Sequence, residues 1–206
     1  MARLTRSESQ ARTRADLIAT ARDLFLTDGY ARTSLDRVAE AAGYSKGAVY
    51  SNFRTKKQLC LEVLDLIHET KFGEITTLLA AGTGLDDQLE RLQEWAERTL
   101  GDVGWTMLEF EFAIVARDDP QLNAELVSSL DAVRGAVAAQ VQILADSAGI
   151  ELPLPAMDAA GAVLSMGIGL GIQRAVDPSL SARLVTDAVR MLLATGTETS
   201  AVRSRS

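Results

Sequence analysis

Residues 33–53 read TSLDRVAEAAGYSKGAVYSNF. This stretch predicts two short helices, over residues 34–42 and 45–53, because its apolar residues recur at the spacing of one helix face. Ser34 and Ser45 are of a type that caps helix N-termini, and Gly43 is of the type that ends a helix in a left-handed turn. Two short helices joined by such a turn have the proportions of a helix-turn-helix, and this motif sets the interpretation of the rest of the chain.

The second predicted helix has a surface suited to the major groove of DNA, which is wide enough for one α-helix. Small and polar residues make up this surface: Ser45, Lys46, Gly47, Ala48, Tyr50, Ser51 and Asn52. The helix N-terminus also presents backbone N–H groups and a partial positive charge to a phosphate. The motif therefore predicts DNA binding.

The segments on both sides of the motif also have helical periodicity. We expect helices over residues 13–28, 56–80, 85–100, 105–117, 120–148, 155–176 and 180–194. No segment has the alternation typical of a strand. The predicted fold class is all-α.

Composition excludes several function classes. The 206 residues include one cysteine, Cys60, and one histidine, His68, which rules out an internal disulfide, Cys/His zinc sites and Ser-His-Asp triads. We expect no metal and no cofactor. The N-terminus lacks an apolar signal segment, and the longest uncharged apolar run, residues 159–172, is shorter than the roughly 20 residues of a membrane-spanning helix. A soluble cytoplasmic protein without membrane contact is expected.

Charge is distributed unevenly along the chain. Residues 1–60 carry eleven Lys and Arg against six acidic residues, a net charge of +5, although the whole chain has a net charge of −7. The remainder must therefore carry −12. This asymmetry indicates that the N-terminal part meets a polyanion while the acidic remainder keeps the protein soluble.

The landmarks around the motif match a known family in order and spacing. They are Gly29-Tyr30, Thr33-Ser34, the run 38–43 (VAEAAG), the run 45–50 (SKGAVY), and Phe53, Lys56 and Leu59. Over about residues 13–71 the chain resembles the DNA-binding domain of bacterial TetR-type repressors. The resemblance implies a larger helical ligand-binding and dimerisation domain over residues 72–195. We expect a flexible basic arm at 1–12 and a disordered tail at 196–206.

The same resemblance implies roles for individual residues. It implies phosphate contacts from Thr33, Tyr50 and Lys56, and contacts at or near the bases from Tyr44, Ser45, Lys46 and Asn52. Ser34 and Gly47 complete the candidate DNA-binding set. Tyr44 stands where valine is common in the family and Asn52 where histidine is frequent, which leaves the base preference open.

A homodimer is expected because a single three-helix module makes few phosphate contacts and binds DNA weakly. Two recognition helices related by a two-fold axis, roughly 34–36 Å apart or a multiple of that, predict a near-palindromic operator. The last two predicted helices are the candidate interface, through Gly161, Ser165, Gly169, Leu184, Ala188, Val189 and Leu192. The alternative is that these helices only complete the core of the monomer.

Aromatic residues and methionines in the middle of the chain suggest a pocket for a small molecule. The candidates are His68, Phe72, Trp95, Trp105, Met107, Glu109, Phe110, Phe112, Met166 and Gln173. The alternative is that they form core. Glu109 and Glu111 point in different directions on one helix, so at most one faces a pocket and the other is expected to be solvated.

These features favour a ligand-relieved repressor, in which a small, largely apolar molecule acts through the helix at 56–80 to release the operator. One alternative is a DNA-binding protein that responds to no ligand, or only to a partner. Another is an all-α enzyme using carboxylates such as Glu109 with Asp118 or Asp119.

Overall fold

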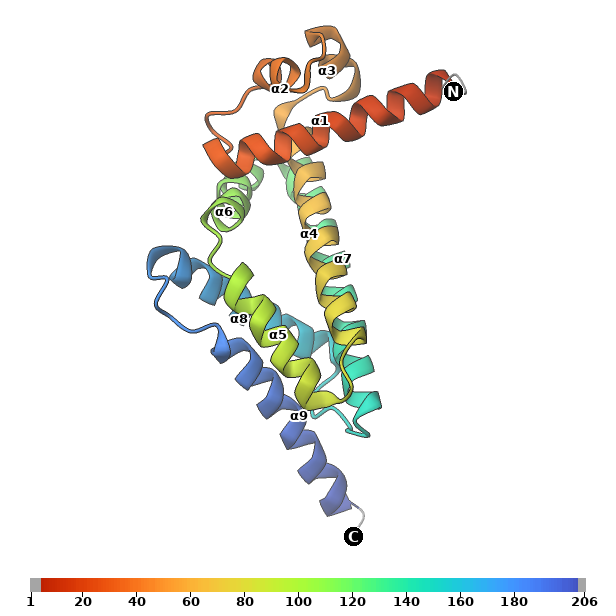
Figure 1. Cartoon of the computed structure of the whole chain (residues 1–206), viewed down its shortest axis with the longest axis vertical. Helices are drawn as coiled ribbons and strands as arrows, with labels where there is room; N and C mark the ends of the chain where they lie inside the picture. Colours follow the sequence, from red (N-terminus) through yellow and green to blue (C-terminus); the bar gives the residue numbers. More distant parts are fainter. Residues whose placement is uncertain (1–4, 204–206) are drawn as a thin grey trace. The chain divides into compact units, whose positions relative to one another are not determined.

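A computed structural model describes residues 5–203, with side chains through residue 194. The described chain forms the helices α1 (Arg6–Asp28), α2 (Leu35–Ala42), α3 (Lys46–Asn52), α4 (Lys56–Ala80), α5 (Leu85–Thr99), α6 (Val103–Arg117), α7 (Pro120–Ser147), α8 (Ala156–Val176) and α9 (Arg183–Arg203) (Figure 1). The all-α prediction is confirmed.

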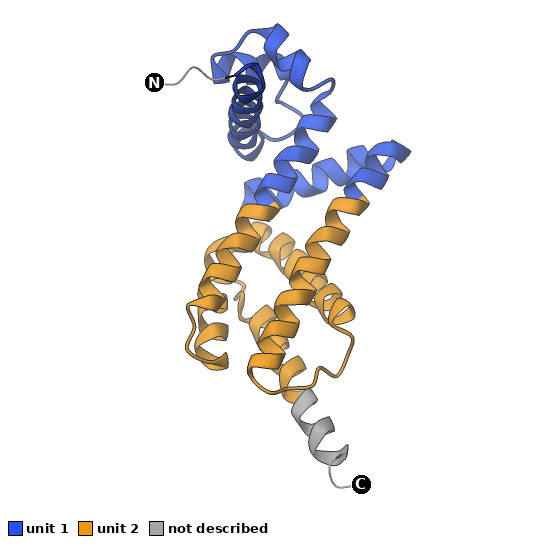
Figure 2. Ribbon diagram, turned by 90° about the vertical axis from the view of Figure 1, so that its right-hand side faces the viewer, with its two compact units in different colours: residues 1–67, 103–126 blue, residues 68–102, 127–206 orange. Residues whose placement is uncertain are grey.

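The chain divides into two compact units (Figure 2). The N-terminal unit consists of residues 1–67 and 103–126, and the C-terminal unit of residues 68–102 and 127–206. The predicted boundary after residue 71 differs from this division, because α6 and the start of α7 pack with the first helices rather than with the segment before them. Helical periodicity in the sequence does not predict that a later segment packs with the first helices.

Helix α1 begins at Arg6, seven residues before the predicted start. A reciprocal cap explains the difference, since Thr5 Oγ1 accepts a hydrogen bond from the Glu8 N–H and Glu8 Oε2 accepts one from the Thr5 N–H. The expectation of a flexible arm over residues 1–12 is therefore wrong for residues 6–12, and residues 1–4 lie outside the described part.

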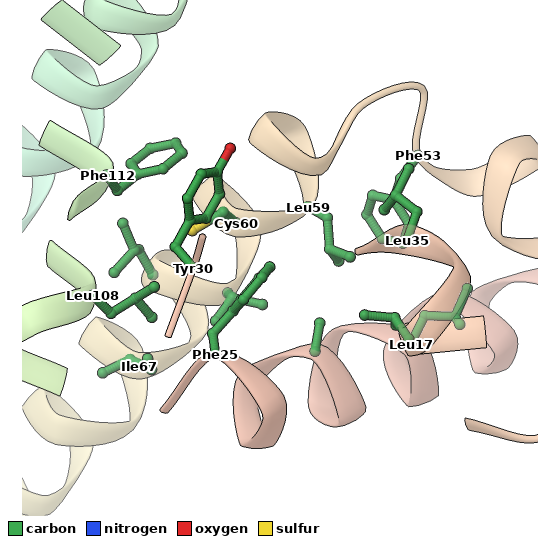
Figure 3. Close-up of a cluster of buried hydrophobic side chains, with 14 of the residues drawn as sticks. Leu17, Phe25, Tyr30, Leu35, Phe53, Leu59, Cys60, Ile67, Leu108 and Phe112 are labelled. Carbon is green, nitrogen blue, oxygen red and sulfur yellow. The ribbon is translucent and has the colours of Figure 1, made fainter. Parts of the chain in front are cut away.

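The core of the N-terminal unit joins the first four helices to α6 and the start of α7 (Figure 3). The ring of Tyr30 lies between α1 and α6, with its centroid 5.7 Å from that of Phe25 and 6.0 Å from that of Phe112. Leu108 lies on the same face of α6 as Phe112, and both residues belong to the same cluster as Cys60 of α4. Burial raises the pKa of the Cys60 thiol, which behaves as a small apolar residue here.

Gly104 lets α6 approach α1. A Cβ at this position would lie 2.5 Å from the backbone oxygen of Leu26, so Gly104→Ala must push the two helices apart. We expect this variant to lower the free energy of unfolding by about 1–3 kcal/mol, the usual cost of overpacking, which thermal unfolding measures. Gly135→Ala is the matched control in α7, where an added Cβ meets nothing within 4 Å. It should stabilise by about 0.5–1 kcal/mol, and equal effects of the two variants would contradict the close approach.

Helices α5, α8 and α9 form the centre of the C-terminal unit. Trp95, Leu170 and Val185 pack in one cluster, and Leu89, Ala145 and Val189 pack in another. Val189 is only 3% exposed, so its assignment to the dimer interface is wrong: it faces the core of its own unit. Helix α9 begins at Arg183 and ends at Arg203, so its last turns coincide with the start of the predicted tail at 196–206. Residues 204–206 lie outside the described part.

A buried arginine fastens the C-terminal end of α8. The guanidinium of Arg174 donates to the backbone oxygens of Leu100 at 2.8 Å and Glu97 at 3.0 Å, and also to that of Leu180. Its Nη1 lies 2.9 Å from Oε2 of Glu97, whose Oε1 accepts from the Ala182 N–H at 2.8 Å. One side chain thus ties the ends of α5 and α8 to the segment that precedes α9.

By length and composition alone, α8 could cross a membrane: its most apolar window has a mean hydropathy of 1.3 and is 28% buried. The uncharged run of residues 159–172 is shorter than this helix, because α8 also includes Asp158 and Arg174. A helix in the core of a protein can have the same length and composition. The hydrogen bonds of Arg174 connect one end of α8 to the rest of its own unit.

Candidate nucleic-acid interface

The predicted helix-turn-helix is present as α2, a turn and α3. Ser34 caps α2 by accepting from the Arg37 N–H at 3.2 Å, and Ser45 caps α3 by accepting from the Ala48 N–H at 3.2 Å. Gly43 has φ of 73° and ψ of 24°, the left-handed conformation that glycine adopts without strain. The two helices lie next to each other on α1 (Figure 1).

One face of α3 is buried and the other is open. Val49 is fully buried in the core, whereas Lys46, Gly47 and Ser45 are exposed and Tyr50 is 52% exposed. Lys46 and Tyr50 both contact Asp36 of α2: Lys46 forms an ion pair with its carboxylate, and the Tyr50 hydroxyl donates to its Oδ1 at 3.3 Å. The hydrogen bond from Lys46 lowers the pKa of Asp36.

Tyr44 and Asn52 stand at the two ends of this surface. The hydroxyl of Tyr44 donates to Oδ2 of Asp16 at 2.7 Å, and this hydrogen bond raises the pKa of Tyr44. Nδ2 of Asn52 donates to the backbone oxygen of Ala48 at 2.8 Å, so one of the two N–H donors of the amide bonds within its own helix. Both side chains are partly exposed.

Two residues predicted to contact phosphate have their side-chain donors in hydrogen bonds within the protein. The side chain of Thr33 is 1% exposed and its hydroxyl donates to the Gly29 backbone oxygen at 3.0 Å, so it closes the turn before α2 instead of facing DNA. Nζ of Lys56 donates to the Tyr30 backbone oxygen at 2.9 Å and lies 4.0 Å from the centre of the Tyr30 ring. Burial lowers the pKa of this lysine. Order and spacing in the sequence do not reveal that these side chains turn inward.

Glu111 has a role that the sequence did not reveal. Its Oε2 accepts from the backbone N–H groups of Tyr30 at 2.8 Å and Ala31 at 3.3 Å, in the turn between α1 and α2. Gly29, next to this carboxylate, has φ of 85°, a conformation that favours glycine. The expectation that one of Glu109 and Glu111 is solvated and the other faces a pocket is thus wrong for Glu111, which binds the turn leading to the DNA-binding helices.

The predicted pocket residues do not form one group. Phe112 is fully buried in the N-terminal core, and Trp105 packs against that core while its Nε1 donates to Glu109 at 2.9 Å. Trp95 lies in the core of the C-terminal unit, where its Nε1 donates to Glu74 at 2.9 Å. For Phe112 and Trp95 the alternative interpretation as core is correct, because their neighbours fill the space around them.

The other pocket candidates are partly or largely exposed. Phe110 is 37% exposed on α6, Met166 is 38% exposed on α8, and Gln173 is exposed beside the buried Arg174. His68, Phe72 and Met107 are half-buried. An open hollow of 720 Å³ lies where α7 leads into α8, and none of the candidates is among its lining residues, which include Gln142, Asp146, Glu151, Leu152 and Pro155.

The acids considered for an enzyme have structural partners. Asp119 accepts from Nζ of Lys57 at 2.9 Å and from the Leu122 N–H at 3.2 Å, so it pairs with α4 and caps α7. Glu109 accepts from the indole of Trp105. Among the described residues, no three His, Cys, Asp or Glu side chains gather where they could hold a metal ion.

The capped α2, the left-handed turn and the open polar face of α3 define a helix-turn-helix protein of the DNA-binding class. Residues 17–63 match the family model described as bacterial regulatory proteins of the tetR family. Over residues 17–63 the chain therefore carries a helix-turn-helix DNA-binding domain of the tetR-family type.

Relatives share this N-terminal region. The chain is 44% identical over 70 residues to the HTH-type transcriptional regulator TtgR of Pseudomonas putida, a match that covers 34% of this chain and 33% of the relative. It is 39% identical over 92 residues to ArpR of Pseudomonas putida, covering 45% and 41%. The matches thus span well under half the length of either relative.

Solved structures extend the similarity in fold to most of the chain. A regulator from Rhodococcus sp. RHA1 gives a TM-score of 0.74 at 18% identity, covering 87% of this chain and 94% of that one. A protein assigned to the TetR family from Mesorhizobium loti gives 0.66 at 23%, covering 93% and 98%. At such identities the likeness concerns the fold alone.

Proposed function

We propose that the protein is an intracellular, sequence-specific transcriptional regulator that binds a near-palindromic operator as a homodimer and represses until a small molecule releases it. The observation that carries the proposal is the exposed polar face of α3, with Ser45, Lys46, Gly47 and Tyr50 open to solvent on a helix braced by α2. Such a face can read base edges in the major groove.

The homodimer is supported by apolar surface on the last two helices. Leu184 is 59% exposed and Met191 68% exposed on α9, and Ala188 lies between them at helical spacing. On α8, Gly161, Ser165 and Ile168 follow the same spacing, and Ile168 is 46% exposed. Gly169 and Leu192 are half-buried next to these rows. Apolar rows of this kind favour a four-helix bundle between two copies.

The state of assembly can be measured directly. Sedimentation of the full chain should give twice the monomer mass of 22.1 kDa. Leu184→Glu together with Met191→Glu should give the monomer while retaining helical circular dichroism, because both side chains are exposed in one copy. A wild-type monomer at micromolar concentration would count against the dimer.

Release by a ligand is the part of the proposal that rests most on the family. Helix α4 begins beside the helix-turn-helix and runs on through His68 and Phe72, so one continuous helix belongs to both units. A molecule that favours one arrangement of this helix would change operator affinity. The second candidate, a DNA-binding protein without a ligand, is favoured by the filled surroundings of Phe112 and Trp95.

Selection of DNA from a random-sequence pool tests the proposal. The wild-type protein should enrich one near-palindromic motif, which then serves to screen small apolar molecules for loss of binding. Enrichment of no motif would refute sequence-specific binding. If the protein binds one motif and no molecule changes its affinity for that motif, the second candidate, a DNA-binding protein without a ligand, replaces the repressor released by a ligand.

A further inference from the structure

Asp36 lies on α2, and each of its two carboxylate oxygens accepts a hydrogen bond from a different side chain of α3. Its Oδ2 accepts from Nζ of Lys46, and its Oδ1 accepts from the hydroxyl of Tyr50 at 3.3 Å. The three side chains are exposed: Lys46 by 70%, Asp36 by 43% and Tyr50 by 52%. This open position is not fixed by packing, and the carboxylate has two partners on the DNA-facing helix.

A carboxylate here changes what Lys46 offers to DNA. Attraction to phosphate is independent of sequence, and each lysine that neutralises a phosphate strengthens binding to every duplex. A lysine already paired with Asp36 gains less from a phosphate, because it must first leave its partner. The ammonium has three donors, so the bond to Asp36 still leaves two for acceptors on a base edge.

We infer that Asp36 determines DNA specificity, because it neutralises Lys46 and orients both Lys46 and Tyr50, and so weakens binding to arbitrary sequence relative to the operator. This inference rests on the proposed function. Asp36 also lies in the first turn of α2, where a negative charge favours the helix. That contribution acts on the stability of the fold, and the melting temperature measures it separately from DNA binding.

The test compares Asp36→Asn with Asp23→Asn on two duplexes. One duplex is the motif selected by the wild-type protein, and the other is a shuffled sequence of the same length and composition. Asp23→Asn is the matched control, since it removes the same charge from an exposed carboxylate that pairs with Arg22 on α1. Dissociation constants are measured from about 50 to 300 mM salt, because the slope reports the number of phosphate contacts.

We expect Asp36→Asn to bind the shuffled duplex up to about fivefold more tightly for each protomer that contacts it, the upper range for releasing one exposed ion pair. Its salt slope on that duplex should be steeper by about 0.9 for each protomer. Affinity for the selected motif should not rise, so the ratio of specific to non-specific affinity falls. The ratio should stay unchanged in Asp23→Asn, and Lys46→Ala should remove the effect of Asp36→Asn on the slope.

Three results would overturn the role of Asp36: equal gains on both duplexes, an effect no larger than that of Asp23→Asn, or a steeper slope that persists in the Lys46→Ala background. A wild-type protein that does not distinguish the two duplexes would instead refute the proposed function itself. Circular dichroism spectra that match the wild type at the temperature of the binding measurements would show that each variant is folded.

Discussion

Lys46→Ala and Tyr50→Ala are each expected to reduce operator affinity strongly while leaving the protein folded. Both side chains are exposed on α3 and belong to the face that the proposal places in the major groove. Loss of one base or phosphate contact weakens binding by roughly five- to a hundredfold, and a symmetric dimer loses the contact twice. Titration of the selected duplex with each variant measures the effect, and circular dichroism checks the fold.

Arg22→Ala is the control for this prediction. It removes one positive charge from α1, where Arg22 pairs with Asp23, without touching α3. A loss of affinity in this variant as large as in Lys46→Ala would mean that general charge, not the α3 surface, governs binding. Retained operator affinity in both Lys46→Ala and Tyr50→Ala would place the DNA-binding surface elsewhere.

Arg174→Ala should have the largest effect on stability. The variant leaves the backbone oxygens of Glu97, Leu100 and Leu180 without their donor and the carboxylate of Glu97 without its cation. Breaking a buried ion pair on one side costs about 3–5 kcal/mol, and the partial exposure of Glu97 places the expected loss near about 3 kcal/mol. A chain of this size should melt roughly 6–12 °C lower.

Arg134→Ala provides the comparison, since Arg134 pairs with Asp131 on the exposed face of α7. An exposed pair on a helix contributes little, so this variant should melt within about 2 °C of the wild type. A similar small change in Arg174→Ala would contradict the view that this one side chain fastens the ends of α5 and α8.

The helices of this chain could be predicted from its sequence because their signals are local. Ser34, Gly43 and Ser45 mark the ends of α2 and α3 where the structure has them, since a cap or a left-handed turn depends on its immediate neighbours. Helices α4 and α6 likewise follow from periodicity. The division into units could not be predicted from the sequence. It depends on where α6 packs after residues 68–102, which belong to the other unit.

The candidate site was predicted less completely, since a motif locates a side chain along the chain but does not give its direction. Thr33 and Lys56 occupy the expected positions, yet both turn inward to backbone oxygens of the turn after α1. The roles of Glu111 and Asp36 come from contacts made by the folded chain: Glu111 bonds across 81 residues, and Asp36 bonds to the neighbouring helix. No pattern in the sequence points to either pairing.

The central claim is that two copies of α3 read one near-palindromic site. Footprinting of the wild-type protein on the DNA upstream of its own gene, across a salt series, tests it most directly. We predict a protected near-palindrome whose occupancy falls steeply with salt, as expected for several phosphate contacts on each half-site. Weak protection without sequence preference at every salt concentration, on this DNA and on the selected motif, would contradict the claim.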